Sequence, residues 1–499
     1  MARSNILTQE ELKEFKDDDF PFENIAFEGG GTKGTAHIGA VRVLEEIGVW
    51  KNMKRFAGTS AGAMVAMCGA LGYDSHDMEE KLAEGGSSKL FDATCKYLTF
   101  LPNIWRHFGW HPGKKMEKWI GEVLKEKLGN ADATFEDLYN YKKNKTDPGK
   151  TELCVVVSDV NQLDCVYCHV KTTPFMPIKI AVRMSISLPG VLYPVKYNNQ
   201  YYVDGGLVNN YPIRAFDGWY LSMKPKDHFL VRLMEFDDMA AAWDPKCQFG
   251  GELNKGTIGV LLYSADEKEM FKEELTKRAE EFAPEVPIPD TALARSRKKK
   301  MDEDNAARKE HEDLVCAMKA YLTLLSKYAD IQKDSISKEA FKRMLEEAAG
   351  DEFTEMKAIL FGPGKTNADI LNSVEVDEDG QITHRAFTKY AESRGIEVIN
   401  VFRGFAGKEI NNLQEYFSTI LDMVMLTSKR VHFERYDLTR TIGVDTGYIG
   451  TLEVDMEEDD ADYMLQQGKR GCMAFLRYYK SQAEQANQAE QTEQAEQAE

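Results

Sequence analysis

A serine between two glycines, in residues 58–62 (Gly-Thr-Ser-Ala-Gly), constrains the fold of this chain more than any other feature. Residues 55–57 (Arg-Phe-Ala) read as the end of a strand, and residues 63–67 (Ala-Met-Val-Ala-Met) read as a buried helix. A strand, a G-x-S-x-G turn and a helix in this order predict a nucleophile elbow. Glycine permits the close backbone approach of such a turn, and the helix amino terminus favours negative charge beside the serine. We therefore predict that Ser60 is a nucleophile, held by the elbow residues Gly58, Thr59, Ala61 and Gly62.

A glycine-rich loop lies one strand–helix unit earlier. Residues 24–28 read as a short strand, and a helix with apolar residues at helical spacing follows the glycines. Consecutive glycines let main-chain N–H groups point at a developing oxyanion without interference from side chains. A phosphate-binding turn is the alternative, since glycines 29, 31 and 34 also satisfy G-x-G-x-x-G. The adjacent serine elbow favours an oxyanion hole, for which the candidates are Gly29, Gly30, Gly31, Thr32, Lys33 and Gly34.

A third motif is an aspartate, Asp204, that leaves a strand directly into Gly205 and Gly206. By itself this D-G-G sequence favours an ordinary turn. Together, the three motifs resemble the signature of the patatin-like phospholipase family, which combines a glycine-rich oxyanion loop, a G-x-S-x-G serine and a D-G-[GA] aspartate. The resemblance extends to other segments, namely residues 181–190 and 209–213 around the aspartate, and residues 440–444 and 471–476, which are similar to the family's closing strand and helix.

This resemblance implies a fold and a reaction. The fold is a patatin-like three-layer α/β arrangement with a mostly parallel sheet, interrupted by a helical insert, and its active site lies at the carboxyl ends of the strands. The reaction is phospholipase A-type hydrolysis of lipid acyl esters by a Ser60–Asp204 dyad, in which Asp204 is the general base and Ser60 forms an acyl-enzyme. A lipid transacylase with the same dyad and a non-catalytic lipid-binding scaffold regulated through the insert are the alternatives.

The histidines agree with a dyad. A serine triad would need a histidine after the acid, but none of the four that follow Asp204 sits in a recognisable strand-end loop: His228, His311, His384 and His432. His37 falls within the helix behind the glycine loop, where we expect it to pack or to cap. Lys33 has two interpretations. It could have a functional role, in which it fixes the loop or contacts a lipid phosphate, or it could be a solvated surface lysine.

Composition restricts the partners and the compartment. The net charge of −19 argues against nucleic acid as a partner and against strong long-range attraction to anionic membranes, whereas the family resemblance implies a lipid or membrane-surface substrate. No run of eighteen apolar residues predicts a spanning helix, and residues 1–20 lack the apolar core of a signal peptide. Eight cysteines in 499 residues are no disulfide scaffold, so we expect a cytoplasmic protein, with secretion by a signal-independent route as the alternative. A lipid substrate would bring such a protein into peripheral membrane contact. Two segments could contact lipid, the basic residues 295–300 and an aromatic group that could equally pack in the core: Phe100, Trp105, Phe108 and Trp110.

Residues 265–395 differ from the rest in being helical and highly charged. Within them, residues 376–382 resemble an EF-hand loop, with Gly380 at the turn and Ile382 at the position that pairs with a partner loop. Ile336 precedes Phe341 by the same offset as Ile382 precedes Phe387, which predicts two paired EF-hand-like units.

The calcium ligands of these loops are poor. The second loop begins at Glu375 and has Ala386 where the bidentate glutamate belongs, and the first offers Ala329, Ile331 and Lys333. We therefore expect no required cofactor, with Asp377 and Asp379 as weak Ca²⁺ candidates and a protein partner as the alternative role of the insert. The predicted domain map is a charged extension (1–20), a catalytic core in two parts (21–264 and 396–478), the insert (265–395) and a disordered Gln/Ala/Glu tail (479–499).

Overall fold

The computed structural model divides the chain into two compact units, Met1–Arg297 with Asn412–Glu499, and Lys298–Asn411. Each unit is described by itself. The residues that the structure describes are 5–16, 18–85, 100–142, 150–235, 242–251, 253–264, 271–330, 334–347, 351–396, 410, 412–451, 453 and 456–496.

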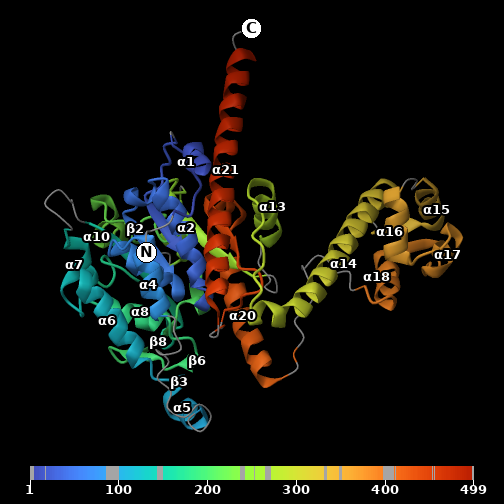
Figure 1. Ribbon diagram of the computed structural model, residues 1–499. Helices are drawn as coiled ribbons and strands as arrows, with labels where there is room; N and C mark the ends of the chain where they lie inside the picture. The colour runs from blue at the N-terminus through green and yellow to red at the C-terminus, as the bar shows by residue number, and fades with distance from the viewer. Residues whose placement is uncertain are drawn as a thin grey trace. The chain divides into compact units, whose positions relative to one another are not determined.

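The first unit is a mixed α/β structure (Figure 1). Its strands are β1 (Asn24–Phe27), β2 (Arg55–Thr59), β3 (Gly109–His111), β4 (Glu152–Asp159), β5 (Asp164–Cys168), β6 (Gly190–Leu192), β7 (Val195–Tyr197), β8 (Gln200–Asp204), β9 (Thr257–Tyr263) and β12 (Thr441–Asp445). Its helices are α1 (Gln9–Glu14), α2 (Thr35–Glu46), α3 (Ala61–Ala70), α4 (Ser75–Gly85), α5 (Phe100–His107), α6 (Lys114–Leu128), α7 (Phe135–Asn140), α8 (Ile178–Ser185), α9 (Gly206–Asn209), α10 (Phe229–Leu233), α12 (Pro245–Phe249), α13 (Lys272–Phe282), α20 (Leu413–His432) and α21 (Glu458–Glu496). Helix α14 (Ala292–Tyr328) begins in this unit and continues into the second.

The central sheet is mostly parallel. Its strand order is β12-β9-β1-β2-β4-β8-β7, with β5 paired to β4 off this path. The five strands from β12 to β4 are parallel to one another, whereas β5, β8 and β7 are added antiparallel. Parallel strands are buried on both faces and are therefore apolar almost throughout, as the fully buried β1 and β9 are. The predicted α/β class with a mostly parallel sheet is confirmed.

Helices cover the sheet and depend on small residues where backbones touch. Helix α21 packs on α2, and a Cβ added at Gly39 would lie 2.0 Å from the carbonyl oxygen of Leu465. Helix α21 also packs on β12, the strand that returns to the sheet after the second unit. Residues 471–476 lie in α21 and are mostly buried. Among the described residues, no helix is both long enough and apolar enough to cross a membrane.

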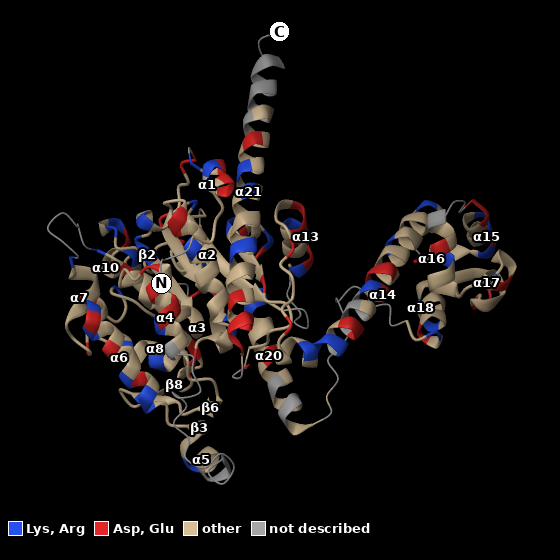
Figure 2. Ribbon diagram, viewed as in Figure 1, with Lys and Arg blue, Asp and Glu red and all other residues tan. Residues whose placement is uncertain are grey.

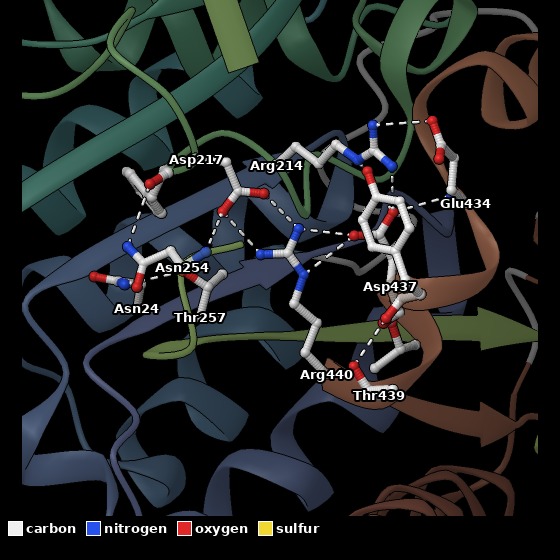
Figure 3. Close-up of polar contacts among 12 residues, drawn as sticks. Asn24, Arg214, Asp217, Asn254, Thr257, Glu434, Asp437, Thr439 and Arg440 are labelled. Carbon is white, nitrogen blue, oxygen red and sulfur yellow. Dashed lines mark hydrogen bonds and ion pairs between the residues drawn. The ribbon is translucent and has the colours of Figure 1, made fainter. Parts of the chain in front are cut away.

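A buried ion network ties the segment before β12 to the first part of the core (Figure 3). The Arg440 guanidinium lies between two carboxylates, with nitrogen–oxygen distances of 2.5 Å to Asp217 and 2.7 Å to Asp437. Arg214 donates to the second oxygen of Asp437 at 3.0 Å. Bidentate arginine–carboxylate contacts are geometrically specific, so this network fixes the register at which the closing segment returns.

The second unit has its own apolar core. It contains β10 (Ser335–Ser337), β11 (Gln381–Thr383) and the helices α15 (Lys338–Glu347), α16 (Asp351–Phe361), α17 (Asn367–Ser373) and α18 (His384–Ser393). Strands β10 and β11 are antiparallel, and Ile336 is paired with Ile382, as the repeated offset predicts. Phe341 and Phe387 both lie in the core of this unit. The identification of the insert as EF-hand-like stays a prediction.

The described residues of this unit do not bring the candidate calcium ligands together. Ile331 and Lys333 lie outside the described residues, and Asp377 uses one carboxylate oxygen to accept the backbone N–H groups of Asp379 and Gln381. Across the part of the chain that the structure describes, no group of three or more His, Cys, Asp or Glu side chains is placed to hold a metal ion.

Three features of the first unit bear on the predicted boundaries, which stay a prediction. Helix α13 lies in the first unit and packs on α21, although its sequence belongs to residues 265–395. The aromatic residues Phe20 and Phe22 of the amino-terminal segment pack on Tyr479. Helix α21 runs through the Gln/Ala/Glu tail to Glu496, with residues 482–486 exposed, and a helix that buries nothing is marginal by itself.

Candidate active site

Ser60 lies on a strained turn between β2 and α3. Its backbone has φ 53° and ψ −125°, a conformation that residues with a side chain rarely adopt and that costs on the order of 1–3 kcal/mol. Two glycines make the turn possible. A Cβ at Gly58 would lie 2.2 Å from the Gly62 carbonyl oxygen, and a Cβ at Gly62 would lie 2.4 Å from that of Phe27. Ser60 therefore lies on a tight turn between a strand and a helix, and its role as a nucleophile stays a prediction.

Asp204 is brought to Ser60 by the pairing of strands around β4. Strand β2 pairs with residues 152–156 of β4, and β8 pairs with residues 157–159. Strand β5 pairs with residues 155–159, so it lies opposite both of them. Because a strand has two edges, β2 and β8 must share the edge opposite β5. They run in opposite directions, so their carboxyl ends meet head to head, and the Ser60 Oγ donates to Asp204 Oδ2 at 2.7 Å.

Burial adjusts the basicity of Asp204. The side chain is 3% exposed, and the loss of water raises its pKa from 3.8 to about 6, although hydrogen bonds to its carboxylate act in the opposite direction. Those bonds come from Ser60 and from the Gly206 N–H, which donates to Oδ1 at 2.8 Å. At neutral pH the group is therefore mostly ionised and able to accept a proton.

Residues 183–187 position Ser60 and Asp204 through hydrogen bonds to their backbone N–H groups. Ser185 Oγ accepts the Ser60 N–H at 2.9 Å and donates to the Val156 carbonyl at 2.6 Å. The Ser187 carbonyl accepts the Asp204 N–H at 3.0 Å, and Arg183 donates to the Ser187 hydroxyl. The sequence indicated this segment only through the family resemblance, because these positioning contacts have no local signature.

The glycine loop lies directly beside the serine. A Cβ at Gly29 would be 3.0 Å from the Cβ of Ser60. Three amides of the loop are used internally: Gly29 donates to the Asn210 carbonyl, Thr32 to that of Thr451 and Lys33 to that of Gly30. Gly31 has φ 57° and packs against the backbone of Thr451. The loop is therefore held by the closing part of the chain.

A buried ion pair fixes the start of this loop and was not predicted. Glu28, which precedes Gly29, accepts Lys429 Nζ at 2.5 Å, and both side chains are buried. The Glu28 carboxylate also accepts the Asn210 side-chain amide at 3.1 Å and the Leu262 N–H at 2.7 Å. Lys429 belongs to α20, so an element that follows the second unit in sequence reaches the oxyanion loop. A lysine within an apolar helix gave only a weak signal for this contact.

Two other predicted residues are buried near the loop. Lys33 is 3% exposed, so the solvated surface lysine considered from the sequence is wrong. His37 is fully buried and its ring nitrogen contacts the Glu28 carbonyl oxygen at 2.8 Å, while burial lowers its pKa to about 4. His37 therefore packs as a neutral ring, as expected.

The described structure pairs Ser60 with Asp204 and with no histidine. His228 precedes α10, while His311 and His384 lie in α14 and α18. His432 lies at the end of α20, and burial lowers its pKa. A cavity of about 380 Å³ is lined in part by Arg55 at the amino end of β2. Since Ser60 follows the carboxyl end of the same strand, this cavity lies away from Ser60.

The family comparison covers the segment that contains both Ser60 and Asp204. Residues 25–217 match the family model described as patatin-like phospholipase. Uncharacterized protein YqhO of Bacillus subtilis is 34% identical over 205 residues, covering 38% of this chain and 65% of that protein. Uncharacterized protein R571 of Acanthamoeba polyphaga mimivirus is 31% identical over 197 residues, covering 39% and 61%. Probable lipid hydrolase 463L of Invertebrate iridescent virus 6 is 24% identical over 195 residues, covering 38% and 62%. Each match spans less than two thirds of the relative's length.

Proposed function

Since this chain belongs to the patatin-like phospholipase family through residues 25–217, we propose that it is a lipid acyl hydrolase that cleaves fatty acyl esters of phospholipids or related lipids. The observation that carries the proposal is the 2.7 Å hydrogen bond from Ser60 Oγ to a buried Asp204 carboxylate. A serine next to a base is the arrangement that forms acyl-enzymes. The similar protein named probable lipid hydrolase 463L supports a lipid substrate.

In the proposed reaction, the acyl group is first transferred to Ser60 and then released by water. Ser60 Oγ attacks the acyl carbonyl while Asp204 accepts its proton, and the proton then passes to the leaving alcohol. Water, activated by the same carboxylate, attacks the acyl-enzyme and releases the fatty acid. This chemistry uses the two side chains and main-chain donors alone.

The loop contacts narrow the choice of oxyanion donors. The amides of Gly29, Thr32 and Lys33 are engaged within the structure, and Gly34 is the last residue of the short 3₁₀ helix Gly31–Gly34. We therefore assign the amides of Gly30 and Gly31 to the oxyanion hole. The amino terminus of α3 adds a favourable dipole at the same place. Removing one oxyanion donor typically lowers the rate by about 10²–10³-fold.

Lipid mass spectrometry tests the proposal. The full chain is incubated with mixed phospholipid vesicles, and Ser60→Ala is compared with Ser296→Ala, which removes an exposed hydroxyl of α14. We expect free fatty acid and lysophospholipid from the wild type and from Ser296→Ala but not from Ser60→Ala. New esters of an added alcohol would identify a transacylase, and an unchanged lipid mixture would favour a lipid-binding scaffold.

A double-mutant cycle tests the dyad. Because Ser60 and Asp204 act as one unit, Ser60→Ala and Asp204→Asn should each remove nearly all turnover, and the double variant should lose little more. Losses that multiply would show that the two residues act independently.

A further inference from the structure

We propose that a surface beside the dyad docks on anionic lipid membranes. This docking patch consists of four apolar residues and two cationic ones: Trp105, Phe108, Val160, Leu163, Arg106 and Lys196. The proposal rests on the proposed function, because it assigns the surface that meets the lipid substrate.

The apolar members of the patch are unusually exposed. Leu163 is 89% exposed, Trp105 is 85% exposed, Phe108 is 60% exposed and Val160 is 48% exposed. Single exposed apolar residues are common on proteins, but a contiguous group marks an interaction site. Of the aromatic segment that the sequence indicated, Trp105 and Phe108 belong to this surface, Trp110 is half-buried, and the Phe100 side chain lies outside the described residues.

Two of these residues are held outward by strained backbone. Phe108 has φ 60° and Leu163 has φ 57°. Among the non-glycine residues described with positive φ, they are the only apolar ones. Bulky side chains rarely occupy this region, and such strain persists where the surrounding structure imposes it, often at functional sites. Phe108 and Leu163 therefore combine a strained backbone conformation with an exposed, large apolar side chain.

The patch is contiguous although it comes from separate segments. Phe108 directly follows α5, and the centre of its ring lies 6.0 Å from the centre of the Tyr201 ring in an edge-to-face contact. The Tyr201 carbonyl accepts the Val160 N–H at 2.9 Å, and its N–H donates to the Asn161 side chain at 2.7 Å. Tyr201 thus joins α5 to the turn between β4 and β5.

The strand register places the patch on the same side of the sheet as the dyad. Asp204 pairs with Val157 of β4, so the turn at residues 160–163 lies just beyond the dyad in the direction of the strand. Tyr201 precedes Asp204 on β8, about 10 Å away along an extended chain. In Figure 1, α5, β3, β6 and β8 gather at one end of the first unit.

Local charge complements an anionic lipid surface despite the net charge of −19. Arg106 and Lys196 are exposed, and Lys196 Nζ lies 5.5 Å from the centre of the Tyr201 ring. Of the carboxylates in the β4–β5 turn, Asp159 is buried and accepts two backbone amides, whereas Asp164 is exposed and accepts the Cys165 N–H, so one exposed acidic side chain lies beside the two cationic ones. Aromatic residues with adjacent Lys or Arg are typical of membrane interfaces.

Another basic surface has less claim to this role. The first turns of α14, which include the basic residues 295–300, are blue in Figure 2. There Arg295 pairs with Asp290, Arg297 with Glu453 and Lys299 with Glu303. These acidic partners reduce its attraction to anionic lipid.

Vesicle sedimentation tests the docking patch without catalysis. The Ser60→Ala chain is mixed with phosphatidylcholine vesicles, with and without phosphatidylserine. The test variant adds Phe108→Asn and Leu163→Asn, because asparagine tolerates positive φ and should keep or raise the melting temperature. The matched control adds Leu230→Asn and Met234→Asn, which are 80% and 86% exposed at α10. Arg232 of α10 shares the distant cavity with Arg55, so the control surface lies away from the dyad.

We expect the test variant to bind vesicles at least about tenfold more weakly, while the control variant binds as the parent does. Replacing Arg106 and Lys196 by Gln should weaken binding about fivefold per charge, and only to vesicles that contain phosphatidylserine. A folded test variant that binds vesicles as well as its parent overturns the proposal.

A second measurement separates this inference from the proposed function. With Ser60 restored, the test variant should hydrolyse a monomeric short-chain ester at the wild-type rate but hydrolyse vesicle phospholipid more slowly. Equal loss on both substrates would contradict a docking role. If the wild type hydrolyses neither ester, the proposed function fails, and the vesicle-binding result still decides the docking patch.

Discussion

At the scale of single residues, the environment of Asp204 determines what the site can do. The carboxylate gains two hydrogen bonds but loses almost all its water, and burial has the larger effect, because the pKa rises to about 6. A general base is most effective when its pKa lies near the working pH. Burial therefore makes Asp204 a better base than an exposed aspartate would be, at a cost in stability.

The pH dependence of turnover should report this pKa. We expect kcat/KM for a monomeric short-chain ester to fall as the pH decreases through about 6, since protonated Asp204 cannot accept the Ser60 proton. Initial rates between about pH 4.5 and 8 measure the acid limb. An acid limb close to the ordinary aspartate value of 3.8 would contradict the effect of burial.

Asp204→Asn should stabilise the fold while it abolishes turnover. Because the folded-state pKa of about 6 exceeds the ordinary 3.8, ionisation above pH 6 favours the unfolded chain. The penalty is at most about 3 kcal/mol at neutral pH and disappears below about pH 4, where both states are protonated. Urea unfolding at these two pH values measures it. An Asp204→Asn variant no more stable than the wild type at pH 7 would disprove the penalty.

At the scale of elements, two helices position the site. Helix α3 does so through a close backbone contact that leaves no room for a side chain, and helix α20 through a buried ion pair. Helix α3 starts against the end of β1, where the Gly62 Cα faces the Phe27 and Glu28 carbonyls. Helix α20 provides Lys429 to Glu28 at the same strand end. Helix α20 also packs on α9, directly after the D-G-G turn. Both helices thus contact the end of β1, where the glycine loop begins.

Gly62→Ala should damage both the fold and the activity. The added Cβ would lie 2.4 Å from the Phe27 carbonyl oxygen and 2.5 Å from that of Glu28, and backbone cannot move aside easily. In α6, Gly121→Ala is the control, because its Cβ would meet nothing closer than 3.5 Å and should stabilise by about 0.5–1 kcal/mol. Thermal melts and ester hydrolysis compare the two, and a fully active Gly62→Ala would show that the contact is loose.

Lys429→Met should destabilise the first unit by about 3–5 kcal/mol, because it leaves a buried Glu28 carboxylate without its charged partner. Adding Glu28→Gln removes that charge and should restore at least half of the loss in a urea titration. A loss of less than about 1 kcal/mol for Lys429→Met would mean that the pair behaves as an exposed one.

At the scale of the whole molecule, the order of the chain matters most. Strand β12 and helix α21 follow the second unit in sequence, yet β12 pairs with β9 and α21 packs on α2. The first unit is therefore incomplete without the end of the chain. The second unit has a separate core, and every described strand of the central sheet belongs to the first unit.

Replacing residues 298–411 with a flexible Gly/Ser linker of about 20 residues should leave a folded first unit that still hydrolyses a short-chain ester, because loop closure costs little more for longer loops. Truncation after residue 264 should give an insoluble product, since β9 loses β12 and becomes an unprotected edge. Circular dichroism and solubility distinguish the two. An active truncated chain would mean that the catalytic fold ends before β12.

Removal of divalent metal should not change hydrolysis. The reaction that we propose for Ser60 and Asp204 needs no metal. The Asp377 carboxylate accepts two backbone amides, and Ala386 stands at the ligand position that a glutamate would fill. Ester hydrolysis in EDTA should equal that in added Ca²⁺. Turnover that disappears in EDTA and returns with Ca²⁺ alone would assign the second unit a regulatory metal site.

The sequence by itself determined the features whose cause is local. The Ser60 elbow needs glycines at 58 and 62 because the turn brings backbone to backbone, and that requirement is legible within five residues. The pairing of Ile336 with Ile382 was likewise predictable, since the two loops repeat one pattern. The buried parallel strands follow from their continuous apolar runs.

Only the tertiary structure decided the features that join distant parts of the chain. The head-to-head meeting of β2 and β8, the Lys429–Glu28 pair and the burial of Lys33 depend on residues far apart in sequence. The pKa of Asp204 depends on the water that those same elements exclude. No local pattern encodes such contacts, because periodicity shows which side of a strand or helix is buried but not which partner buries it.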